Sequence, residues 1–237
     1  MRKIIVAIFL VLTFLCSCSD LNNATKLKPD DAYKPKPDDA VKLKPDDAYK
    51  PKPDDAIAHS NRGIAYNNRG QYQRAIEEYN EAIRLKPDLA EVYSNRGIVY
   101  AKLGQHQRAI DDYNEAIRLK PDFAEAYNNK GTAYNRLGQY QHAIDDFNKA
   151  IRLKPKDATL YYNRGIAYDN LGKLQRAIED FNEAIRLKPD DALAYTNRAG
   201  AYFMQGNKKL FCRDVQKACA LGDCKLFEMA KGKQYCR

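Results

Sequence analysis

The chain has 237 residues, of which 44% are hydrophobic and 30% charged, and it contains no tryptophan. This balance is typical of a solvated helical array with a thin core and argues against one large globule. The formal charge is +9, but basic residues cluster after Asn207. The rest of the chain lacks the basic stripe with interleaved aromatics that nucleic-acid binding requires, so we expect no nucleic-acid partner.

Residues 1–17 have the pattern of an export signal. Two basic residues precede an apolar run from Ile4 to Leu15, which is short for a membrane-spanning helix. The run ends in the sequence LCSC, which resembles the bacterial lipoprotein signal. The resemblance implies cleavage before Cys18, acyl chains such as palmitate on that cysteine, and, from Ser19, an outer-membrane lipoprotein facing the periplasm. The alternatives are a cleaved leader with a soluble periplasmic or secreted product, and an uncleaved anchor.

Residues 18–55 are predicted to be a disordered tether. From Lys26 to Asp55 the sequence repeats an octapeptide, KLKPDDAY, whose lysines and aspartates cancel in charge. Proline recurs every few positions and almost no apolar side chain is available for burial. An extended segment of this length reaches about 90 Å.

After the tether, the stretch from Ala90 to Phe123 recurs with a 34-residue step. Self-similarity at a fixed period of this size predicts a repeat architecture. The step links small residues, tyrosines and prolines: Gly63, Gly97, Gly131, Gly165 and Ala199; Tyr66, Tyr100, Tyr134, Tyr168 and Tyr202; Pro87, Pro121, Pro155 and Pro189.

Each unit contains two helical runs. In the second unit, apolar residues recur at three- and four-residue spacing before Gly104 and again between Ala109 and Pro121. Gly97 and Ala116 are small, which suggests a close crossing of the two helices. Neither helix can bury its apolar face alone, so neighbouring units must stack.

This pattern resembles the tetratricopeptide repeat, through Gly97, Tyr100, Ala109, Tyr113, Ala116 and Pro121. The resemblance implies an all-α, right-handed superhelical solenoid of helix-turn-helix units. The units are 56–89, 90–123, 124–157, 158–191 and a variant fifth unit, 192–225, followed by a C-terminal capping helix in 226–237.

Two departures from the family pattern matter: the basic residue before the glycine, and His59 in the first unit. The position before the glycine is basic in every unit, and one position of the second helix is acidic. In the first unit, His59 replaces the family's bulky early aromatic residue. We predict an ion pair between the two rows, within or between units; the alternative is a basic ladder for an acidic ligand. The rows are Arg62, Arg96, Lys130, Arg164 and Arg198, and Glu78, Asp112, Asp146, Asp180 and Asp214.

Four cysteines lie in the last part of the chain, and in an exported protein they indicate two disulfides. Cys212 and Cys219 would lie on one helix about 10 Å apart, too far for a bridge. Nested pairing, Cys219–Cys224 with Cys212–Cys236, is favoured over the crossed pairing Cys212–Cys224 with Cys219–Cys236. A zinc site is the rival interpretation. The bridges would hold a short helix whose Leu226, Phe227 and Met229 cover the last repeat.

In the family, the first helices line a groove, and here one groove position is asparagine in all five units. An amide pairs with a peptide backbone whatever its side chains, as in the similar asparagine ladder of O-linked N-acetylglucosamine transferase. The alternative is that these amides bridge neighbouring units. The predicted groove residues are Asn61, Asn95, Asn129, Asn163 and Asn197, with Tyr162, Arg136 and Lys102, and with Asn67 and Asn135 nearby.

No nucleophile, metal or phosphate motif stands out, and His106 and His142 fall near helix turns where solvated polar residues are ordinary. We therefore expect neither enzyme activity nor a cofactor or metal. The expected function is a lipid-anchored scaffold that binds a peptide or partner protein in its groove. The alternatives are an assembly module of an envelope complex that uses its ends or convex face, and contact of the basic C-terminal end with an anionic surface.

Overall fold

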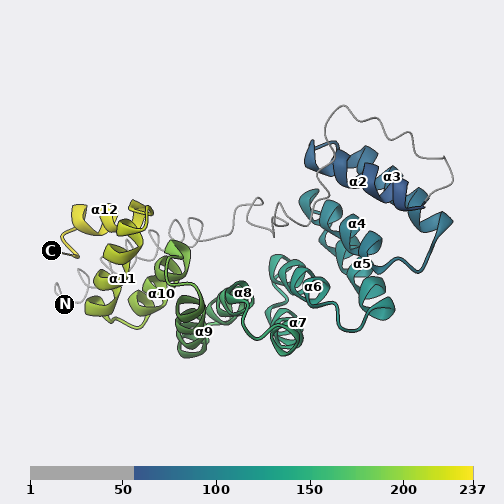
Figure 1. Cartoon of the computed structure of the whole chain (residues 1–237). Coiled ribbons are helices and arrows are strands. Elements are labelled where there is room, and N and C mark those ends of the chain that lie inside the picture. The colour runs from purple at the N-terminus through teal and green to yellow at the C-terminus, as the bar shows by residue number, and fades with distance from the viewer. Residues whose placement is uncertain (1–55, 237) are drawn as a thin grey trace, which may run out of the picture. The chain divides into compact units, whose positions relative to one another are not determined.

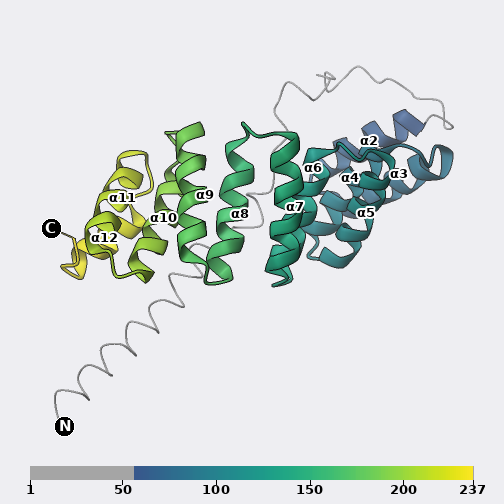
Figure 2. The same cartoon turned by 90° about the horizontal axis from the view of Figure 1, so that it is seen from below.

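A computed structural model describes residues 56–236, so the predicted leader, Cys18 and the tether lie outside the described residues. The described part consists of eleven helices, which confirms the all-α prediction. Five helix pairs follow one another in chain order, and a single helix closes the array (Figures 1 and 2). The pairs are α2 (Ala56–Asn68) with α3 (Tyr72–Leu85), α4 (Ala90–Lys102) with α5 (His106–Leu119), α6 (Ala124–Arg136) with α7 (Tyr140–Leu153), α8 (Ala158–Asn170) with α9 (Leu174–Leu187), and α10 (Ala192–Met204) with α11 (Lys208–Ala220); the last helix is α12 (Lys225–Gly232).

Glycine ends the first helix of every pair. Gly104 has a φ of +74°, a left-handed conformation that residues with a Cβ rarely adopt. The N–H of Gln105 then donates to the carbonyl of Tyr100 at 2.9 Å and closes the helix end. The second helix ends where Lys120 donates to Ala116 at 2.9 Å, just before Pro121.

The predicted close crossing of the paired helices is confirmed at the glycine row. A Cβ built on Gly97 would lie 2.7 Å from Cε1 of Tyr113, so no larger residue fits without moving that ring. The fifth unit shows the matching exchange: Val215 occupies the place of the aromatic residue, and Ala199 replaces the glycine. The smaller partner leaves room for the extra methyl group.

The predicted ion pairs are confirmed, and each lies within one unit. Each joins the first helix to the second, which is why both residues recur with the same step. The nitrogen–oxygen distances are 2.9 Å for Arg62–Glu78, 2.7 Å for Arg96–Asp112, 3.1 Å for Lys130–Asp146, and 2.6 Å for both Arg164–Asp180 and Arg198–Asp214.

The same cations also contact the preceding unit, through a row of asparagines that is not among the predicted residues. Arg96 donates to Oδ1 of Asn80 at 2.6 Å, and its guanidinium lies over the rings of Tyr93 and Tyr100. Each of the four cations after Arg62 therefore ties together both helices of its own unit and the second helix of the unit before. The row is Asn80, Asn114, Asn148 and Asn182, and its 34-residue step is visible in the sequence.

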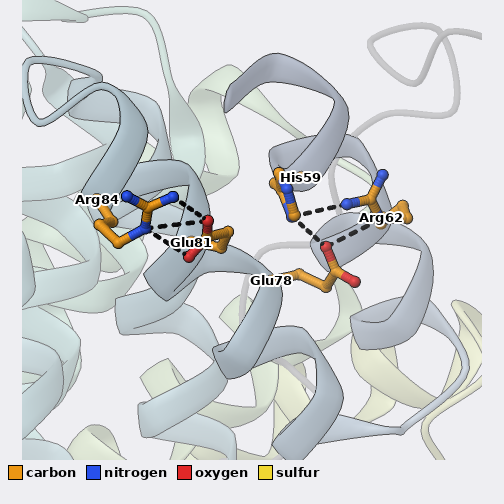
Figure 3. A network of polar contacts seen from close by, with 5 residues as sticks. All are labelled: His59, Arg62, Glu78, Glu81 and Arg84. Carbon is orange, nitrogen blue, oxygen red and sulfur yellow. Dashed lines mark hydrogen bonds and ion pairs between the residues drawn. The ribbon is translucent and has the colours of Figure 1, made fainter. Parts of the chain in front are cut away.

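Within the described residues no helix pair precedes the first unit, and His59 takes part in its ion pair. Nδ1 of His59 lies 2.6 Å from Nη2 of Arg62 and 2.8 Å from Oε2 of Glu78 (Figure 3). Figure 3 also shows Arg84 paired with Glu81 along the surface of α3, at 2.5 Å. The departure from the family's aromatic residue thus supplies a polar partner where α2 lacks a neighbouring repeat.

At the other end, two disulfides join α11 to the segment that follows it. The structure pairs Cys212 with Cys236, at a Cα–Cα distance of 5.5 Å, and Cys219 with Cys224, which is the nested arrangement that the sequence favours. Leu226 and Ala230 of α12 are buried, whereas Met229 is 39% exposed. The prediction that Met229 covers the last repeat is therefore wrong, because Ala230, four residues after Leu226, shares its buried face.

A double-mutant cycle on Arg96→Met and Asp112→Ala tests whether the ion pair holds the two helices together. We expect a coupling energy of about 2 kcal/mol, because each single variant leaves a buried charge without its partner. Urea unfolding combined with amide hydrogen exchange in α4 and α5 measures it. The exposed pair Glu115–Arg118 on α5 is the matched control and should show no measurable coupling. Additive effects of Arg96→Met and Asp112→Ala would contradict the assignment.

The two disulfides should differ in their contribution to stability. Loss of Cys212–Cys236, which closes a separation of 24 residues, is expected to cost about 3 kcal/mol, and loss of Cys219–Cys224, which closes 5, about 2 kcal/mol. Paired Cys→Ser variants and hydrogen exchange in α11 and α12 measure this, with α2 to α5 unaffected. Non-reducing peptide mapping that found crossed pairs or free thiols would refute the arrangement.

Candidate functional site

The first helices of neighbouring units contact one another directly: α2 with α4, α4 with α6, α6 with α8, and α8 with α10. Each second helix packs instead against the first helix of the next unit. An array whose first helices are drawn together curves towards them. We call the side formed by α2, α4, α6, α8 and α10 the inner face.

The predicted asparagine row lies on these helices, but its members are not equivalent. Nδ2 of Asn163 donates to Oδ1 of Asn128 at 2.9 Å, and Nδ2 of Asn197 donates to the hydroxyl of Tyr162 at 2.9 Å. In the last two units the row therefore bridges neighbouring repeats, as the alternative interpretation proposed.

In the first three units the amides are open. The side chains of Asn61, Asn95 and Asn129 have no hydrogen-bond partner in the part of the chain that the structure describes. The cause lies 35 residues earlier, where Asn128 and Tyr162 are replaced by the shorter Ser60 and Ser94. A serine hydroxyl does not reach across the helix contact, so the amides of the next unit stay available.

The other predicted groove residues mostly contact one another. Nζ of Lys102 donates to Oδ1 of Asn67 at 3.0 Å and lies 5.7 Å from the ring centre of Tyr72. Nδ2 of Asn170 donates to Oδ1 of Asn135 at 3.4 Å. Lys102 and Tyr162 thus serve contacts between units.

His106 differs from the expectation of a solvated turn residue. Its Nδ1 is buried and lacks a hydrogen-bond partner within residues 56–236. Burial and the nearby charge of Arg136 lower its pKa, so the ring is neutral at physiological pH. His142 is exposed, as expected, and stacks on Tyr134 with ring centres 5.2 Å apart.

Asp169 on α8 is a feature of the inner face that is not among the predicted residues. Its side chain is half-buried and has neither a hydrogen bond nor an ion pair within the described chain. Burial raises its pKa from 3.8 to about 6, so the folded state favours the protonated form. The sequence signal is a break in one row: Asp169 is the single acid among the counterparts Asn67, Ala101, Asn135 and Phe203.

This carboxylate reduces stability at neutral pH. Because its folded pKa lies above the ordinary value, the protonated folded state is favoured at low pH. As the pH rises from about 4 to about 6 this advantage is lost, and the free energy of unfolding falls by about 2 kcal/mol. A partly buried acid that lowers stability and has no pairing cation in the described chain is a candidate functional residue.

Within residues 56–236, no group of three or more His, Cys, Asp or Glu side chains is placed to hold a metal ion. The helices of the same range include none that is long and apolar enough to cross a membrane.

Solved structures with this arrangement include two of MamA. MamA from Desulfovibrio magneticus RS-1 is 25% identical, with a TM-score of 0.67, over 72% of this chain and 96% of that chain. A second MamA crystal structure is 29% identical, with a TM-score of 0.64, over 72% and 96%. YrrB, described as a TPR protein with an unusual peptide-binding site, is 23% identical, with a TM-score of 0.64, over 76% and 93%, and shows the fold alone.

A comparison with curated protein sequences gave no match. The family model for the tetratricopeptide repeat matches residues 90–123, 124–157 and 158–191, and a second TPR repeat model matches residues 65–104. Together these matches span residues 65–191, more than half of the chain. The chain therefore belongs to the tetratricopeptide repeat family.

Proposed function

We propose that this protein is a non-enzymatic scaffold, anchored in the bacterial envelope by lipid, that holds an extended peptide of a partner protein on its inner face. The observation that carries the proposal is the set of open amides on α2, α4 and α6. Each offers two donors and one acceptor, which suits a peptide backbone of any sequence. Asn61, Asn95 and Asn129 recur at the same position of successive units, so they present one chemistry along the face.

Rigidity of the array supports this proposal. In the second unit, Arg96 directly follows Asn95 on α4 and is fixed by Asp112, Asn80 and two tyrosine rings. A backbone held in this way presents the neighbouring amide with little freedom to lose on binding, and such preorganisation favours affinity. The peptide-binding site named for YrrB, which shares the fold, is consistent with this use.

The test is capture of partners by the variant Asn95→Ala with Asn129→Ala. Crosslinking in the envelope followed by mass spectrometry should show at least a roughly tenfold loss of captured partner, because two backbone contacts disappear. The matched control, Gln107→Ala with Gln141→Ala, removes exposed amides from the second helices α5 and α7 and should capture normally. Unchanged capture by the asparagine variant would favour an assembly module that uses its ends or convex face.

The second candidate is contact of the C-terminal end with an anionic surface. The observation in its favour is the exposure of basic residues on α11, α12 and the segment after it, where Glu228 is the one exposed acid in 207–236. Partner retention that persists in the asparagine variant but is lost with rising salt would support it. The exposed basic residues are Lys208, Lys209, Arg213, Lys217, Lys225, Lys231 and Lys233.

The lipid anchor is proposed from the sequence motif ending at Cys18. Replacement by Cys18→Ala should release the protein from the membrane fraction or block its processing, because several acyl chains give stable anchoring. Intact-mass measurement of the membrane fraction should show the added lipid on the native chain. A variant that stayed in the membrane with unchanged mass would refute lipidation there.

A further inference from the structure

Asp169 is the starting point, because an ionised carboxylate is an acceptor with four lone-pair sites and here none is used by the described chain. Each unit's other inward acid, Glu78, Asp112, Asp146, Asp180 or Asp214, is paired with a cation of its own unit. Asp169 lies instead on the first helix of its unit, at a position where the other units carry amides or apolar side chains.

No neighbouring charge compensates it. Charged or titratable groups on the packed elements include Lys130 and Arg136 on α6, His142 on α7, Lys173 and Arg176 around the start of α9, and Arg198 on α10. Burial is nevertheless the one cause of the raised pKa of Asp169. Lys130 and Arg198 are engaged by Asp146 and Asp214.

An apolar strip on α10 adjoins this carboxylate. Residues 35 positions apart on neighbouring first helices come within hydrogen-bonding reach, as Lys102 and Asn67 do. The same register places Met204 beside Asp169 and Phe203 beside Tyr168. Met204 is 61% exposed, and Leu193 at the other end of α10 is 44% exposed.

The strip occurs in the fifth unit, and the ring of Phe203 within it is held in place by neighbouring rings. Counterparts of Met204 in the other units are polar or charged: Asn68, Lys102, Arg136 and Asn170. The ring of Phe203 is held by Phe211 and Tyr235, with each pair of ring centres 5.4 Å apart. The disulfide-bonded segment after α12, which contains Tyr235, therefore packs against Phe203 and holds its ring in place.

We infer that the inner face at α8 and α10 selects a partner peptide in which a lysine or arginine lies next to a large apolar side chain. The cation pairs with Asp169, and the apolar side chain packs on Phe203 and Met204, together with the methylene stem of the basic residue. The inference rests on the proposed function and adds sequence preference to it. Open amides in the first three units hold the backbone, and the last two units recognise side chains.

The experiment uses the full mature chain in detergent and short capped fluorescent peptides with a central Lys-Leu pair in a Gly-Ser background. The Lys-Leu peptide should bind about tenfold more tightly than analogues with norleucine-Leu, Glu-Leu or Lys-Ser. Asp169→Asn should abolish the preference for lysine over norleucine. The control Asp145→Asn, an exposed acid on α7, should preserve it.

The pH dependence gives a second readout. Affinity of the native chain for the Lys-Leu peptide should rise about tenfold between pH 5 and pH 7.5, as Asp169 loses its proton near pH 6. The Asp169→Asn variant should show a flat profile, and so should the norleucine peptide. A native profile that matched the variant's would overturn the assignment.

The outcomes separate this inference from the proposed function. Equal binding of all peptides, lost in the Asn95→Ala and Asn129→Ala variant, would overturn the inference and leave the proposed function standing. Binding of Lys-Leu that depended on Asp169 but not on the two asparagines would support the inference and remove the backbone ladder. No binding of any peptide would overturn the inference, whereas envelope capture would still test the function.

The chain's own N-terminal segment contains the same chemistry, in Lys26-Leu27 and Lys42-Leu43. If deletion of residues 26–55 raised the affinity for the Lys-Leu peptide, that segment would be the occupant, and the assignment to a partner peptide would be overturned. Unchanged affinity after the deletion would support the partner peptide.

Discussion

The array depends on one paired, partly or fully buried cation in each unit. Arg96 joins Asp112 of its own second helix to Asn80 of the preceding unit, between two tyrosine rings. Burial raises the pKa of Asp112 and of Asp180 although their arginines lower it, so removal from water outweighs the attraction. Buried pairs of this kind contribute little net stability. We interpret the row as fixing geometry: where the cation is arginine, the directional fork of the guanidinium favours one crossing of the two helices and one position of the preceding unit.

A contact that requires a neighbouring unit cannot form in full at the two ends of the array. Each end replaces it with a different contact. At α2, where no preceding asparagine exists, His59 joins Arg62 and Glu78. At α11 the ion pair Arg198–Asp214 is retained and is the most buried of the five, because the following segment covers it. The terminal repeat of a solenoid lacks a neighbour, and here the cover is attached by disulfides.

Much of this could be predicted from the 34-residue step, because residues that recur together must serve the same contact in each unit. The step predicts a repeat architecture, the tetratricopeptide resemblance implies the solenoid, and the charges of the two rows favour ion pairs; the asparagines at 80, 114, 148 and 182 share the same step. Which of the inner-face amides make hydrogen bonds could not be predicted in this way, because that depends on a different residue in each preceding unit. Asn197 finds a tyrosine there and Asn163 finds an asparagine, whereas Asn95 and Asn129 face only Ser60 and Ser94. Side-chain length at one variable position decides which amides are free.

Asp169 could not be evaluated from its residue type, since an isolated acid on a helix is ordinarily solvated. Its surroundings distinguish it: the first helices converge, water is partly excluded, and the nearby cations Lys130 and Arg198 are paired with Asp146 and Asp214. Repeats stabilise one another through nearest-neighbour contacts, so the array tolerates one unfavourable group that a small domain would lose. A ligand cation that paired with Asp169 would remove this cost in the bound state. In a scaffold whose backbone contacts are independent of sequence, that position is where selectivity for a partner can reside.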